Sequence, residues 1–95
     1  MALMEPIDAI GRLLAILFAG PAPTNAERIQ YGYDIIGWYE NPVVTEDEHA
    51  MFQLRSVRFR WKATIPKDAD AETLATMYCL WDEIEEAFRK TQRPK

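Results

Sequence analysis

The stretch that most constrains the fold lies between Leu54 and Ile65. Apolar and polar residues alternate along it, with Val57, Phe59, Trp61, Ala63 and Ile65 set against Arg58, Arg60, Lys62 and Thr64. Side chains of a strand point to opposite faces in turn, so this alternation is typical of a strand with one buried face. The pattern predicts a long strand that has an apolar face and a basic face.

Residues 29–39 are the predicted partner of that strand, and Asn41-Pro42 ends the segment. An antiparallel register aligns the two apolar faces, with Ile35 opposite Val57, Tyr33 opposite Phe59 and Tyr31 opposite Trp61. A slip of one residue would set apolar side chains against basic ones. The two segments therefore predict a long hairpin whose connecting loop is acidic.

Two amphipathic helices are predicted to flank the hairpin. The first begins at Pro6 and ends at Gly20-Pro21. The second covers residues 70–90 and has Asp70 as its N-cap, with Asp68 as the alternative. Its apolar stripe contains Leu74, Met77, Tyr78, Trp81, Ile84 and Phe88. Helices on one face of a hairpin make a two-layer α+β fold, helix–strand–strand–helix, with residues 1–95 as a single domain. Trp61 and Trp81 are predicted to pack in one layer of its core.

The residue types that carry chemistry are sparse. The chain has one His, one Ser and one Cys, and a nucleophile needs a base within reach. Cys79 falls between core positions of the second helix and is predicted to be a buried packing residue. The run Glu46–His49 lacks the spacing of a calcium loop, and the glycines lack a phosphate-binding pattern. The sequence predicts that the protein is not an enzyme and has no cofactor or metal site.

Charge is unevenly distributed along the chain. Residues 1–50 contain two Arg and eight Asp or Glu, whereas residues 51–95 contain nine Lys or Arg and seven Asp or Glu. The net charge of −4 argues against a general nucleic-acid binder. A stacking platform also needs aromatic and basic side chains on one face, and strand alternation separates them. The asymmetry favours charge-guided contact, either between the two halves of the chain or between copies of it.

The apolar run Leu13–Ala19 raises the question of a signal peptide or membrane segment. Glu5 and Asp8 stand where a signal peptide carries positive charge, and the run is far too short to span a bilayer. We therefore expect a protein that is not secreted by a signal peptide and has no membrane partner.

The predicted hairpin leaves an apolar patch on the side away from the helices, formed by Ile36, Trp38, Phe52 and Leu54. Arg58 and Arg60 lie beside it, and the acidic loop residues Glu46, Asp47 and Glu48 of a neighbouring copy are their predicted docking partners. Buried aromatic anchors dominate interfaces, and a head-to-tail contact of this kind can close into a ring. The alternative is that the first helix covers the patch and leaves a monomer.

Three segments, Ile7–Phe18, Arg55–Ile65 and the run from Asp68 to Phe88, resemble the small tail-terminator and head–tail joining proteins of tailed bacteriophages. The resemblance implies a non-enzymatic, ring-forming subunit of a phage tail or neck. Its partners would be copies of itself and adjacent virion proteins, in the virion or the host cytoplasm. The alternative function is a small acidic protein-binding module or inhibitor of a host protein.

Overall fold

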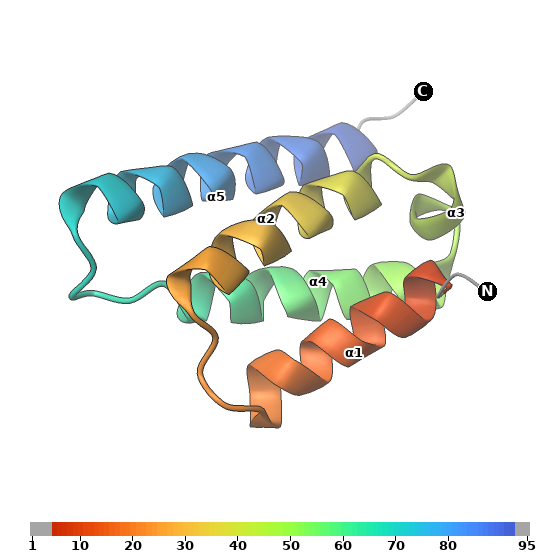
Figure 1. Ribbon diagram of the computed structural model, residues 1–95. Helices are drawn as coiled ribbons and strands as arrows, with labels where there is room; N and C mark the ends of the chain where they lie inside the picture. The colour runs from red at the N-terminus through yellow and green to blue at the C-terminus, as the bar shows by residue number, and fades with distance from the viewer. Residues whose placement is uncertain (1–4, 93–95) are drawn as a thin grey trace.

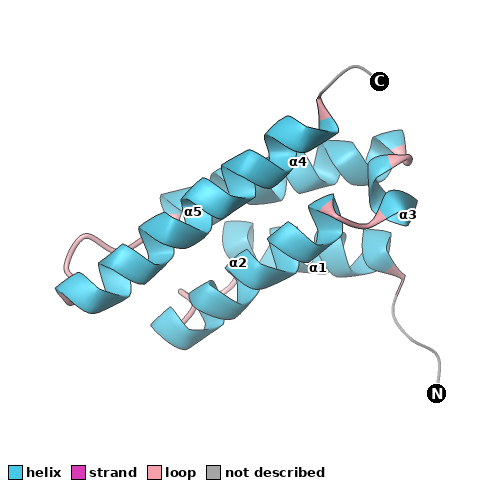
Figure 2. Ribbon diagram, turned by 90° about the horizontal axis from the view of Figure 1, so that it is seen from above, coloured by secondary structure: helices cyan, strands magenta, loops and turns pink. Residues whose placement is uncertain are grey.

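The computed structural model describes residues 5–92, and this part of the chain is helical without any strand (Figure 1). Its elements are α1 Pro6–Ala19, α2 Asn25–Tyr39, α3 Pro42–Thr45, α4 Glu48–Ala63 and α5 Ala71–Thr91. The predicted α+β class is therefore wrong. Figure 2 shows only helices and connecting loops along the described residues.

The four long helices pack as two pairs, and contacts between α2 and α4 join the two pairs. α1 packs along α4, α2 packs along α5, and α2 also contacts α4. The short helix α3 closes one end of the molecule, between the end of α2 and the start of α4 (Figure 1). This arrangement buries one face of every long helix and leaves the outer face of α4 exposed.

The two predicted flanking helices are confirmed. α1 begins with Pro6 in its first turn and ends at Gly20, whose N–H donates to the Ile16 carbonyl oxygen. The Asp70 carboxylate caps α5 by accepting from the Thr73 N–H. Both helices are set by local signals, since a first-turn proline and an acidic N-cap satisfy or remove backbone donors that have no intrahelical partner.

The predicted strand over residues 54–65 lies almost entirely in α4. The buried side chains of this helix recur at helical spacing: Ala50, Leu54, Val57, Arg58 and Trp61. Strand alternation would bury Phe59 and expose Arg58, whereas Phe59 is 51% exposed and Arg58 only 4%. The Asp47 carboxylate starts the helix by accepting from the N–H groups of His49 and Ala50.

The second predicted strand is α2, which begins with a capping box. The Thr24 hydroxyl accepts from the Glu27 N–H, and the Glu27 carboxylate accepts from the Thr24 N–H. These bonds satisfy two N–H groups that a helix start leaves free, and the bond from the Thr24 N–H lowers the pKa of the Glu27 carboxylate. The predicted acidic loop is also partly helical, because Val44 of α3 is fully buried and anchors it.

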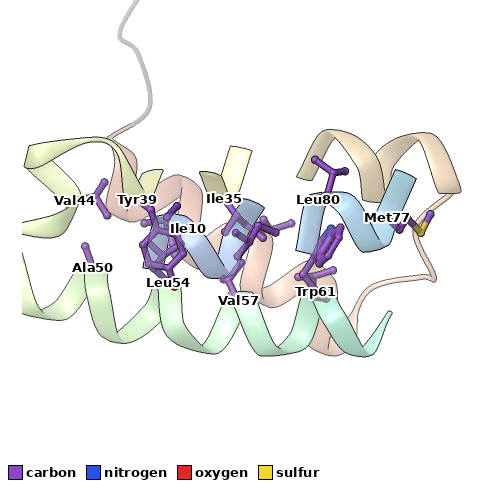
Figure 3. Close-up of a cluster of buried hydrophobic side chains, with 14 residues drawn as sticks. Ile10, Ile35, Tyr39, Val44, Ala50, Leu54, Val57, Trp61, Met77 and Leu80 are labelled. Carbon is purple, nitrogen blue, oxygen red and sulfur yellow. The ribbon is translucent and has the colours of Figure 1, made fainter. Parts of the chain in front are cut away.

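The core lies between α4 and the other long helices (Figure 3). The Trp61 ring is fully buried and stacks on the Trp81 ring, with centroids 6.4 Å apart and planes 10° apart. Its Nε1–H donates to the Arg28 carbonyl oxygen at 2.7 Å. The two tryptophans pack together as predicted, but the predicted layer between a sheet and helices is wrong, because Trp61 belongs to α4 and Trp81 is only half-buried.

Two glycines of α2 are expected to respond oppositely to alanine. A Cβ on Gly32 would lie 3.0 Å from Cζ2 of Trp61 and 3.2 Å from Cδ1 of Leu80, whereas a Cβ on Gly37 would meet nothing within 4 Å. Gly37→Ala should raise the free energy of unfolding by about 0.8–1 kcal/mol, the difference in helix propensity. Gly32→Ala should lower it, because overpacking against the buried Trp61 ring costs about 1–3 kcal/mol, which exceeds the same propensity gain over most of that range. Urea unfolding checks both; equal stabilisation would contradict the close approach of α2 to Trp61.

Candidate protein interface

An exposed stripe runs along the outer face of α4. It contains two aromatic and two basic side chains at three- and four-residue spacing, Phe52, Arg55, Phe59 and Lys62, called the α4 stripe here. Phe52 is 71% exposed and Phe59 is 51% exposed. Residues seven apart lie two turns apart on one helix face, so the two rings form one apolar ridge with positive charge beside it.

On both flanks of this stripe, basic side chains lie over aromatic rings. The Arg58 guanidinium carbon lies 4.6 Å from the centre of the Phe59 ring, and the Lys62 ammonium lies 4.6 Å from that of Trp81. On the flank that faces α1, Nε of Arg60 donates to the Leu17 carbonyl oxygen at 2.9 Å, and the Arg60 guanidinium lies over Phe18. The predicted basic face is thus divided, since Arg55 and Lys62 are exposed while Arg60 is held against α1.

Arg58 belongs to an internal charge pair. Its Nε lies 3.5 Å from Oε1 of Glu85, which is too long for a strong hydrogen bond but close enough for charge attraction. The guanidinium carbon also lies 3.8 Å from the centre of the Phe88 ring. Burial raises the pKa of the neighbouring Tyr39 hydroxyl, and the positive charge of Arg58 opposes that effect. Arg58 is therefore not the free cation that docking on a second copy would need.

An open groove of about 1080 Å³ lies where α2 and α5 end beside α3. Its apolar wall is formed by Ile36, Tyr39, Met51 and Ala87, and its charged lining residues are Glu40, Glu46, Glu83, Glu86 and Lys90. Four carboxylates and one ammonium make the lining strongly negative. This acidic groove draws its residues from two stretches of the chain that are distant in sequence, residues 36–51 and residues 83–92.

The structure disperses the predicted apolar patch. Leu54 is fully buried in the core, and Trp38 is half-buried against the core. Phe52 points outward on α4, whereas the half-buried Ile36 lines the acidic groove. The patch does not exist as one surface, because α2 and α4 are helices and direct these side chains in different directions.

The predicted acidic residues also have separate positions. Glu46 lines the acidic groove, Asp47 is engaged as the N-cap of α4, and Glu48 is exposed in the first turn of that helix. Sequence reasoning missed Arg55 and Lys62 as stripe residues and Glu40 and Glu83 as groove residues. The helical spacing of residues 48–63 is the sequence signal that indicates the stripe, whereas no local sequence pattern indicates the groove.

Residues that could carry chemistry lie apart from one another. Cys79 is exposed on α5, so its predicted role as a buried packing residue is wrong. The Ser56 hydroxyl donates to the Phe52 carbonyl oxygen within α4. Over residues 5–92 no three His, Cys, Asp or Glu side chains gather as metal ligands would. None of the helices described is long and apolar enough to cross a membrane.

Comparisons of the chain with protein-family models, with curated proteins and with solved structures find no match. The α4 stripe and the acidic groove are therefore interpreted from their own geometry and chemistry.

Proposed function

We propose that the protein is a non-catalytic assembly protein that associates with copies of itself through the α4 stripe. The observation that supports this proposal is the exposure of Phe52 and Phe59, 71% and 51%, on one face of a helix whose opposite face builds the core. Aromatic residues and arginine are enriched in the anchoring centres of protein interfaces. The stripe combines both, because Arg55 lies between the two rings along the helix.

From the resemblance to phage tail and neck proteins, this proposal keeps only the expectation of a self-associating, non-enzymatic subunit. Part of that resemblance depends on a hairpin over Arg55–Ile65, and most of that segment is α4. We therefore propose the broader class, a self-assembling structural subunit, and specify neither ring size nor virion position. An adaptor for a different protein would expose the same stripe, but it would be a monomer on its own.

The proposal is tested by the mass of the purified protein across a range of concentrations, measured by light scattering. We expect the wild type to exceed the 11.0 kDa of one chain. The double variant Phe52→Ser/Phe59→Ser should shift toward monomer, because truncating a central aromatic anchor costs about 2 kcal/mol or more, roughly 30-fold in Kd.

The matched control is Val43→Ser, which removes a 67% exposed apolar side chain on α3, outside the stripe. It should leave the mass unchanged, and far-ultraviolet circular dichroism should show all variants folded. A wild type that stays monomeric at every concentration, or an equal effect of Val43→Ser, would contradict the proposal.

A further inference from the structure

We infer that the acidic groove receives the α4 stripe of a second copy, so that subunits join head to tail. The inference rests on the proposed self-association and names the second surface that takes part in it. Stripe and groove share no residue: α2, α3, α5 and Met51 of α4 line the groove, whereas the stripe occupies the outer face of α4. A contact between two different surfaces is heterologous and generates rings or filaments.

Charge complementarity is the first argument for this occupant. The stripe carries two positive side chains, Arg55 and Lys62, and the groove is lined by four glutamates with only Lys90 against them. Glu86 is shared with Arg89 of its own helix, at 3.3 Å, so Glu40, Glu46 and Glu83 are the carboxylates left to meet an incoming cation. Complementary potentials of this kind select a partner and its orientation.

Shape is the second argument. The groove is open and, at about 1080 Å³, slightly exceeds the roughly 300–1,000 Å³ typical of small-ligand pockets. Its wall offers Ile36, Met51 and Ala87 to an apolar ligand. The α4 stripe is a ridge of aromatic side chains flanked by basic ones. It therefore matches an open groove that has an apolar wall and a negative lining.

The competing arrangement pairs two stripes antiparallel about a two-fold axis. Such a pair would set Glu48 near Lys62 of the other copy, but the axis would then pass close to Arg55. Two Arg55 guanidinium groups would face each other, and like charges in contact oppose association. The groove would also remain uncovered. Both features favour the head-to-tail contact.

A mixing experiment separates the two arrangements. The stripe variant Phe52→Ser/Phe59→Ser keeps an intact groove, and the groove variant Glu40→Lys/Glu83→Lys keeps an intact stripe. Each alone should be monomeric. An equimolar mixture should form a complex of two chains and nothing larger, because one intact stripe meets one intact groove. The control Asp68→Lys/Asp82→Lys makes the same charge change at exposed positions outside the groove and should assemble as the wild type does.

The outcomes distinguish the inference from the proposed function. If the wild type assembles, the groove variant assembles equally well and the mixture gives no two-chain complex, the inference fails and self-association stands. If the wild type does not assemble, both fail. Should the groove variant lose its helical circular dichroism signal, Glu83→Gln replaces it. That variant should weaken assembly by about tenfold and reduce its sensitivity to salt, because one charge pair is lost.

Discussion

Trp61→Ala is expected to lower the free energy of unfolding by about 3–5 kcal/mol. That loss is comparable to the whole stability of many domains, roughly 5–15 kcal/mol, so the variant should be largely unfolded or unfold at low urea. Trp61 is fully buried, stacks on Trp81 and donates to the Arg28 carbonyl oxygen. Its removal leaves a cavity at the junction of α2, α4 and α5 and removes the hydrogen bond to the Arg28 carbonyl oxygen. Urea unfolding followed by circular dichroism measures the effect.

The matched control for this prediction is Trp38→Ala. Trp38 is a half-buried tryptophan of α2 that packs at the edge of the core, so its removal leaves a smaller cavity. It should lower the free energy of unfolding by less than Trp61→Ala does. Equal losses, or a Trp61→Ala protein that unfolds cooperatively at the wild-type midpoint, would contradict the assigned centre of the core.

The sequence predicts the outer helices well because their signals are local. A proline at a helix start, an acidic N-cap and an apolar stripe over residues 70–90 each act within a few residues. The same kind of signal was present for α2, where Thr24 and Glu27 have the spacing of a capping box. The hairpin reading overlooked it and treated the tyrosines and isoleucines of 29–39 as strand residues.

The central error concerns the period of residues 54–65. Alternation over nine residues, from Val57 to Ile65, fits a strand, but the same window also fits a helix with Val57 and Trp61 one turn apart. Extending it back to Ala50 and Leu54 shows the helical period that the core follows. The strand period assigns part of each face wrongly: it places Phe59 inside and Arg58 outside, whereas Val57 and Trp61 are buried under either period. The acidic groove could not be predicted, because its residues meet only through tertiary packing.

The buried ion pair gives the second large expected effect. Glu85→Gln should lower the free energy of unfolding by about 1–3 kcal/mol, below the range for a fully buried pair, because the Glu85 side chain is 30% exposed and lies 3.5 Å from Arg58. Arg58, which is 4% exposed, would keep a charge without its carboxylate. Asp82→Asn is the control, since it neutralises an exposed carboxylate on the same helix outside the acidic groove.

Adding Arg58→Met to Glu85→Gln should recover most of the lost stability. The second change removes the buried charge and fills its place between Phe59 and Phe88 with an unbranched apolar side chain. The recovery appears as a coupling free energy in a double-mutant cycle measured by urea unfolding. Additive losses would show that Arg58 and Glu85 act independently. The predicted coupling arises because a helix places Arg58 on the same inner face as Leu54 and Trp61, where its charge requires a partner within the chain.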